Sequence, residues 1–158
     1  MRTKKAKLRQ ISPDPKYRSV KIAKLINHSM KNGKKSVAQK QVYEALEMAG
    51  EKAKLKPIEL FDEVLRVLSP KMEVRSRRVG GAAYQVPVPI KGRRAFSLSV
   101  RWLVQESNKR SSKEYHSYAE KLSAEMLDVL QNVGAAIAKR DAAHRMAEAN
   151  KAFAHFRW

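Results

Sequence analysis

The chain has 158 residues and a hydrophobic fraction of 43%, which suffices for one domain with a folded core and excludes a chain that is disordered throughout. Its formal net charge of +19 requires an anionic partner, because a compact body with this charge repels itself; nucleic acid, an anionic membrane surface and an acidic protein are the candidates. The sequence has no apolar run long enough to span a bilayer, no signal-peptide core after its basic start and no cysteine, which excludes disulfides and thiolate metal sites and fits a reducing compartment.

Residues 1–11 are interpreted as a flexible basic arm. The arm is nearly free of apolar residues and its charges repel one another, so we expect it to become ordered only on a polyanion. Its cations include Lys4, Lys5, Lys7 and Arg9. A very short targeting sequence is the weaker alternative. The Ser-Pro-Asp-Pro segment at 12–15 separates the arm from the folded body, because residues before proline avoid the helical region.

Two helices are predicted directly after this segment. The first starts with Ser19 as N-cap, carries apolar residues at helical spacing and ends at Asn32-Gly33. The second opens at Ser36, because Ser36 and Gln39 have the spacing of a capping box. The Lys34-Lys35 pair then lies in the loop between the two helices.

A third helix is predicted between Pro57 and Pro70. Pro57 suits the first helical turn, where its missing N–H is not needed, and Pro70 stops the apolar pattern. The apolar face of this helix comprises Leu60, Phe61, Val64, Leu65 and Leu68.

Residues 71–90 predict a two-stranded β-ribbon. Two runs able to extend flank Gly80 and Gly81, and adjacent glycines accept the positive φ angles of a two-residue hairpin turn. With that turn, directly opposed residues share a face of the ribbon. One face carries Arg75, Arg77 and Tyr84, and the other carries Ser76, Arg78 and Gln85. Such a ribbon fits a nucleic-acid groove, with arginines for phosphates and an aromatic ring for a base; an ordinary surface hairpin is the alternative.

A fourth helix begins near Arg93. Its apolar residues cover most of its circumference, which predicts a central position in the core. Its polar stripe consists of Arg94, Ser97, Arg101 and Asn108. We interpret the two arginines of this stripe as phosphate contacts, because acids are outnumbered in the chain; pairing with Asp62 or Glu63 is the alternative.

Two further helices are predicted in the C-terminal part. A second Ser-x-x-Glu pattern at Ser111 predicts the start of the fifth helix, and Gly134 predicts its end. Residues 135–138 are interpreted as a joint of small residues, and Asp141 as the cap of a last helix that runs to about Phe153. This helix is rich in Ala and poor in large apolar residues, so we expect it to project from the body.

No arrangement of residues fits a catalytic or metal site. The four histidines lack metal-ligand spacing, Gly80-Gly81 lacks the spaced glycines and lysine of a phosphate-binding loop, and no serine is accompanied by a recognisable base and orienting acid. Glu73 lies among arginines and is interpreted as part of a structural ion pair at the foot of the ribbon. We therefore expect no enzyme activity, no cofactor, no metal and no small-molecule substrate.

The distribution of positive charge favours folded RNA as the partner. Basic residues occur in the arm, the Lys34-Lys35 loop, the ribbon, the Arg94/Arg101 stripe, Lys139-Arg140 and the last helix, whereas a DNA-reading helix would concentrate them on one element. The rival interpretation is a protein that coats nucleic acid or anionic membrane nonspecifically, which would require a broad amphipathic basic helix.

Several long motifs resemble the small-subunit ribosomal protein seven family of bacterial type. They are Pro13-Asp14-Pro15-Lys16, Gly33-Lys34-Lys35-Ser36, Glu73-Val-Arg-Ser-Arg-Arg-Val-Gly-Gly81, Tyr84-Gln-Val-Pro87, Arg101-Trp102 and the ending from His144 to Trp158. The resemblance spans the whole chain. It implies a structural component of the small ribosomal subunit, in a bacterial cytoplasm or an organelle. This component is a primary binder of small-subunit ribosomal RNA that nucleates assembly of the head and lies beside the exit-site transfer RNA and the messenger RNA.

The resemblance also assigns expected roles to individual residues. Ribosomal-RNA contacts, in addition to the arm, would be Lys34, Lys35, Arg75, Arg94 and Arg101. The ribbon tip near transfer RNA and messenger RNA would contain Arg77, Arg78, Gly80, Gly81 and Tyr84. The C-terminal helix, with Arg145 and Lys151, would lie near transfer RNA and small-subunit protein eleven, and protein nine would be the other neighbour.

The combined expectation is a mainly α fold, with a six-helix body and one protruding two-stranded β-ribbon between helices three and four. Its parts are the flexible basic arm at 1–11, a helical RNA-binding domain at 12–140 with the ribbon at 71–90, and a C-terminal basic helix and tail of the same domain at 141–158. Two departures from the family pattern are local. Ala82-Ala83 replaces hydroxyl residues expected after the glycines, and the stretch from Ser111 to Tyr118 is longer than usual and carries extra tyrosines.

Overall fold

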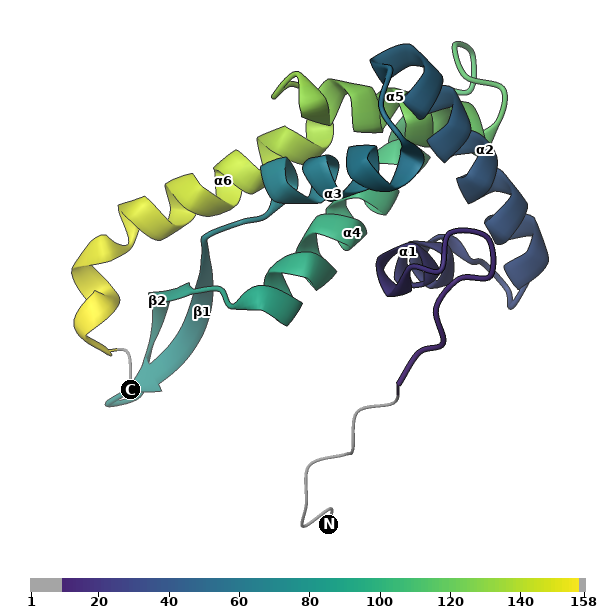
Figure 1. Cartoon of the computed structure of the whole chain (residues 1–158). Coiled ribbons are helices and arrows are strands. Elements are labelled where there is room, and N and C mark those ends of the chain that lie inside the picture. The colour runs from purple at the N-terminus through teal and green to yellow at the C-terminus, as the bar shows by residue number, and fades with distance from the viewer. Residues whose placement is uncertain (1–9, 157–158) are drawn as a thin grey trace.

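The computed structural model describes residues 10–156, which form a helical body with a two-stranded antiparallel ribbon extending from it (Figure 1). This confirms the predicted mainly α fold with a ribbon between the third and fourth helices. The elements are α1 (Val20–Ser29), α2 (Lys35–Ala53), α3 (Pro57–Leu68), β1 (Met72–Val79), β2 (Ala82–Pro89), α4 (Gly92–Lys109), α5 (Tyr118–Leu130), α6 (Ala135–Ala149) and the 3-10 helix η1 (Lys151–Phe156).

The hydrophobic core lies where α2, α3, α4 and α5 pack together. Each helix supplies at least one large side chain that is at most 1% exposed: Leu46 from α2, Phe61 from α3, Leu103 from α4 and Met126 from α5. Full burial of such a side chain contributes about 1.5–3 kcal/mol. Helix α4 contacts α1, α3, α5 and α6, which confirms its predicted central position.

The ribbon has the register that its two glycines predict. Gly80 and Gly81 have φ values of +57° and +92°, so both occupy the left-handed region that a type I′ turn requires. Arg77 is paired with Tyr84 across the strands, and Val79 with Ala82. In the middle of β2, opposite Arg75, Val86 is fully buried, and β2 contacts η1 and α6.

Two helices begin at other residues than predicted because their capping patterns were misassigned. Helix α2 begins at Lys35 with Lys34 as N-cap and no side-chain cap, so Ser36 already has helical backbone and cannot cap. Helix α5 begins at Tyr118, seven residues after Ser111. The Oγ atom of Ser117 accepts a hydrogen bond from the backbone N–H of Glu120 at 3.2 Å, so the Ser-x-x-Glu pattern that caps α5 is the second of two in this stretch.

The last α-helix begins at Ala135, so the prediction of a joint at 135–138 and a cap at Asp141 was wrong. Its N-terminus is capped by a side chain from α5: Oε1 of Glu125 accepts a hydrogen bond from the backbone N–H of Ala136 at 2.9 Å. Gly134 precedes the helix with φ +95°, and a Cβ atom at this position would lie 3.0 Å from Cβ of Asp128. This position therefore requires glycine.

The C-terminal elements lie against the ribbon and do not project freely from the body. Helix α6 contacts β1, and Ala147 in this contact is 4% exposed. The 3-10 helix η1 then contacts β2, and Figure 1 shows this yellow segment close to the ribbon. The prediction of a projecting helix failed because α6 packs on α3, α4 and α5 as well as on the ribbon, although few of its side chains are large.

Candidate nucleic-acid interface

The loop between α1 and α2, together with the first residue of α2, presents three exposed lysines and is called the lysine loop below. Lys31, Lys34 and Lys35 are all exposed, and no carboxylate among residues 10–156 forms an ion pair with them. The turn that carries them has positive φ angles of +52° at Asn32 and +74° at Gly33. The first turn of α2 contains no acidic residue, so its positive dipole end adds to the field of the lysines. This loop can bind phosphate groups.

Glu73 at the foot of the ribbon holds two of the predicted RNA-contact arginines. Its Oε1 atom lies 2.6 Å from a terminal guanidinium nitrogen of Arg75, and its Oε2 atom lies 3.1 Å from Nε of Arg94. The side chain of Glu73 is 12% exposed, whereas those of Arg75 and Arg94 are 54% and 48% exposed. Burial tends to raise the pKa of Glu73, but the hydrogen bonds from both arginines outweigh it and the pKa is lowered. Glu73 is therefore ionised at neutral pH.

This arrangement confirms the predicted ion pair at the foot of the ribbon and joins β1 to α4. The two guanidinium groups and one carboxylate leave a net charge of +1, and both arginines keep exposed surface for a further anion. The alternative that the arginines of α4 pair with Asp62 or Glu63 is wrong for Arg94. Asp62 instead pairs with Lys21 at 2.7 Å, and Glu63 pairs with Arg66.

A further positive region lies where α1 meets α4. Arg101 is exposed on α4. Its positive charge and that of Lys24 on α1 interact electrostatically with His28. Burial and these two positive charges lower the pKa of His28, so its imidazole is neutral at pH 7. The positive potential here therefore comes from Arg101 and Lys24. Nζ of Lys24 lies 4.9 Å from the ring centroid of Phe96, which orients this lysine.

The predicted residues of the ribbon tip differ in exposure, because Tyr84 packs against η1 while most of the others face solvent. Arg78, Gly80 and Gly81 are exposed, and Arg77 is half-buried. The ring of Tyr84 packs against η1, with its centroid 5.3 Å from that of Phe153 and 5.1 Å from that of Phe156. Sequence reasoning could not find this contact, because the residues are far apart in the chain.

The remaining basic positions divide into exposed and inward-facing groups. Arg145 is exposed on α6, and Lys151 is exposed with its Nζ 3.4 Å from Oε1 of Glu148. Lys139 pairs with buried Glu106 at 2.7 Å, and Arg140 donates to the backbone carbonyl of Val67 at 2.7 Å. Lys139 and Arg140 therefore stabilise contacts between helices, although the sequence suggested that they form a basic patch.

Predicted contacts in the arm lie outside the described residues. These are Lys4, Lys5, Lys7 and Arg9. In the described part, Lys31 and Lys24 are positive residues that sequence reasoning missed. The signal for Lys31 was its place beside Asn32-Gly33, since the exposed turn extends from 31 to 35.

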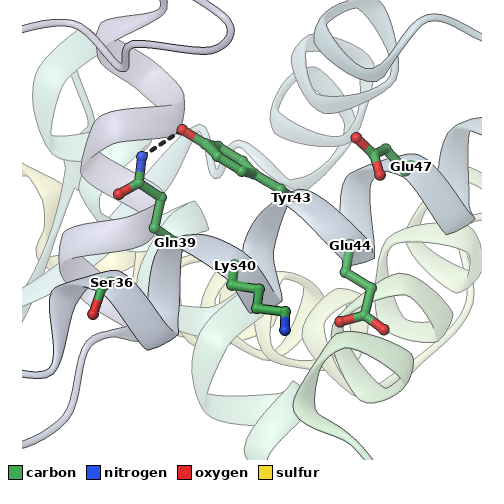
Figure 2. Close-up of a pocket in the computed structure, with 6 residues that line it drawn as sticks. All are labelled: Ser36, Gln39, Lys40, Tyr43, Glu44 and Glu47. Atoms are coloured by element: carbon green, nitrogen blue, oxygen red, sulfur yellow. Dashed lines mark hydrogen bonds between the residues drawn. The ribbon is translucent and has the colours of Figure 1, made fainter.

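The outer face of α2 carries a hollow with a different character (Figure 2). Gln39 and Tyr43 turn towards each other, and Nε2 of Gln39 donates to the Tyr43 hydroxyl at 2.6 Å. That hydroxyl donates to buried Asp14 at 2.6 Å, which fastens the segment before α1 to α2. Lys40, Glu44 and Glu47 also line the hollow, and Glu47 pairs with Lys16, so its charged groups are of both signs.

Other site types find no support between residues 10 and 156. No group of His, Asp and Glu side chains in this range could hold a metal ion. None of its helices is both long and apolar enough to cross a membrane.

Comparison with known proteins identifies relatives over almost the whole chain. The family model described as Ribosomal protein S7p/S5e matches residues 1–151. A relative from Marinobacter nauticus is 52% identical over 157 residues, covering 99% of this chain and 99% of the relative. One from Hahella chejuensis is 54% identical over 157 residues with the same coverage, and one from Dichelobacter nodosus is 52% identical over 154 residues, covering 98% of this chain and 97% of the relative. All three are called small ribosomal subunit protein uS7.

Proposed function

This chain belongs to the ribosomal protein S7p/S5e family, and we propose that it is a structural component of the small ribosomal subunit that binds small-subunit ribosomal RNA. The main observation that supports RNA binding is which charged side chains are exposed and which form ion pairs. Cations on the α1–α2 loop, the ribbon and α4 stay exposed. Asp62, Glu63 and Glu106 pair with other cations, and Glu73 leaves both of its arginines about half exposed.

The exposed cations suit a ligand that meets the protein from several sides. Phosphate contacts supply affinity, and the shape of the surface supplies position on a folded RNA. The Glu73 pairings support this role, because they hold Arg75 and Arg94 in place before an RNA phosphate arrives. Preorganised groups lose less side-chain freedom on binding.

The finer role that we propose follows the family. The protein is a primary binder that nucleates assembly of the head, and the ribbon tip and C-terminal helix face the exit-site transfer RNA and the messenger RNA. Its protein neighbours are small-subunit proteins nine and eleven. The exposure of Arg78 and Arg145 supports a nucleic-acid partner at that end of the molecule.

The test of ribosomal-RNA binding compares two triple variants of the full chain. Replacement of Arg75, Arg94 and Arg101 by Ala should weaken binding to a head-domain RNA fragment. It should also reduce the slope of log affinity against log salt, by roughly 0.7–0.9 for each phosphate that is no longer neutralised. The matched control replaces three exposed lysines by Ala, namely Lys40, Lys52 and Lys113. This variant loses the same amount of positive charge as the arginine variant. The measurement is filter binding at several salt concentrations, with circular dichroism to check folding.

Equal slopes for the two triple variants would contradict the assignment of these arginines. Bulk duplex DNA serves as competitor in the same assay. At moderate salt the DNA should fail to displace the RNA fragment from the protein. If the protein coated polyanions by charge alone, the DNA would displace the RNA fragment.

A further inference from the structure

A small cavity lies at the lysine loop, where four helices meet. Its volume is about 200 Å³, and it is lined by residues from α2, from the C-terminal ends of α1 and α4, and from the N-terminal end of α5. The lining residues that matter for its chemistry are Lys31, Lys34, Val37, Gln41, Asn108 and Tyr118. None of them was assigned to this cavity by sequence reasoning, because the fold brings them together from distant parts of the chain.

The cavity presents apolar surface to solvent. Val37 is 57% exposed, the largest exposed fraction of any large hydrophobic residue between 10 and 156. Tyr118 is half-buried beside it, and its hydroxyl is satisfied by a 2.9 Å hydrogen bond with Oγ of Ser29. Burial raises the pKa of Tyr118, so the phenol is neutral. An aliphatic side chain and a neutral aromatic ring form walls suited to a flat, weakly polar group.

Two side-chain amides give the cavity hydrogen-bonding capacity. The Asn108 amide nitrogen donates to the backbone carbonyl of Val104 at 2.8 Å, which leaves its carbonyl oxygen as an acceptor. Oε1 of Gln41 accepts from the backbone N–H of Ala119 at 3.1 Å, while its amide nitrogen has only a 3.5 Å contact with Glu44. One open acceptor and one weakly engaged donor match the edge of a nucleobase.

The entrance of the cavity is positive. Lys31 and Lys34 line it, and Lys35 follows directly in the chain; all three are exposed. The hollow on the outer face of α2 (Figure 2) differs on the same helix, because two carboxylates, those of Glu44 and Glu47, line it beside Lys40. Of these two hollows, the cavity at the lysine loop is the one that has lysines but no carboxylate among its lining residues.

We propose that this cavity takes one unstacked nucleobase of the bound RNA, with Lys31 and Lys34 contacting the adjoining phosphates. The proposal rests on the ribosomal-RNA binding proposed above and deepens it, because it assigns a base contact in addition to phosphate contacts. A nucleotide within an RNA chain fits better than a free mononucleotide. Stacking of one base contributes only about 1–3 kcal/mol, which gives little affinity without further contacts along the chain.

The experiment combines base removal in the RNA with substitution in the protein. Single nucleotides in unpaired positions of a head-domain fragment are replaced by abasic ones, and binding of the full chain is measured for each. With the unsubstituted protein, one abasic position should weaken binding about tenfold. Val37→Glu places a carboxylate in the cavity and should exclude the base. Removal of the base at the same RNA position should then cause no further loss of affinity for this variant. Asn108→Ala, which removes the open acceptor, should reduce the penalty at the same position.

Val133→Glu is the matched control. Val133 is 51% exposed and lies at the α5–α6 turn, outside the cavity, so this variant changes the charge equally. It should retain the full tenfold penalty. Urea unfolding of all variants shows whether they fold. If Val37→Glu does not fold, Asn108→Ala still tests the proposal.

Three results would overturn the inference while leaving the proposed function intact. The first is tight, RNA-specific binding with no sensitive abasic position. The second is an abasic penalty that Val37→Glu and Asn108→Ala both leave unchanged. The third is loss of binding to poly-glutamate, but not to the RNA, in Val37→Glu, which would indicate an acidic peptide as occupant. Failure of the unsubstituted protein to prefer the RNA fragment over duplex DNA would instead overturn the proposed function itself.

Discussion

At the residue scale, Glu125 connects three parts of the molecule. It is 1% exposed, and its two oxygens bind different partners: Oε1 caps α6 through Ala136, and Oε2 lies 2.7 Å from a guanidinium nitrogen of Arg110. Arg110 also pairs with Asp128 and donates to the Tyr115 hydroxyl at 3.2 Å. Burial opposes the charge on Arg110, but these carboxylates outweigh it and raise its pKa. The arginine thus remains charged inside a closed network.

Removal of this carboxylate should therefore destabilise the fold strongly. Glu125→Ala leaves a largely buried guanidinium with one carboxylate fewer and an uncapped helix end, and we expect a loss of about 3–5 kcal/mol in the free energy of unfolding. Glu125→Gln keeps an acceptor for Ala136 and should lose less. Urea denaturation measures both. Exposed Glu44→Ala is the control and should stay within about 0.5 kcal/mol; an equally small effect of Glu125→Ala would refute the network's role.

At the scale of elements, the ribbon depends on the segment that packs beside it. A two-stranded ribbon is marginal alone, and here Tyr84 contacts Phe153 and Phe156 of η1, while α6 covers β1. Aromatic pairs of this kind contribute about 0.5–1.5 kcal/mol each beyond their buried area. The ribbon tip and η1 therefore stabilise each other through these rings.

Tyr84→Ala should release η1 from the ribbon without affecting the helical core. Backbone amides at 151–156 should exchange with solvent faster, because their helix loses its aromatic support, while amides in α2 and α5 should be unchanged. Hydrogen exchange followed by mass spectrometry measures this. Tyr84→Phe keeps the ring and should behave as the parent protein. Slow exchange at 151–156 in the alanine variant would show that other contacts hold η1.

The elements also show which structural information was local. The register of the ribbon was predictable because two adjacent glycines determine the turn and the turn determines every cross-strand pair. The exposure of Lys34, Arg94 and Arg101 followed from local patterns in the same way. The start of α6 was not predictable, because its cap comes from Glu125 on another helix. The cavity beside Val37 was missed for the same reason, since four helices contribute to it.

At the scale of the whole molecule, the basic residues proposed to contact ribosomal RNA and Arg78, proposed to contact transfer RNA, lie in different regions. The lysine loop and the exposed arginines of α4 belong to the helical body, whereas Arg78 lies at the far end of the ribbon (Figure 1). The proposed contacts with ribosomal RNA and the proposed contacts with transfer RNA can therefore be altered separately.

Arg78→Ala should leave subunit assembly intact and change retention of exit-site transfer RNA or reading-frame fidelity. The physical reason is that Arg78 is exposed at the tip and its removal disturbs no packed group. The measurements are sucrose-gradient profiles, a reading-frame reporter and binding of exit-site transfer RNA. Arg66→Ala, which removes an exposed charge paired only within α3, is the control. Loss of assembly with normal fidelity and transfer-RNA retention would reverse the assigned roles.

The contact between Tyr84 and η1 has a consequence for biosynthesis. Translation delivers the ribbon well before Phe153 and Phe156, so a nascent chain cannot complete this surface until synthesis has passed residue 156. A fragment interrupted upstream of these two rings would fold its helices with an uncovered hairpin. In such a fragment the ring of Tyr84 would lack both aromatic partners, so this side of the hairpin would be exposed to solvent.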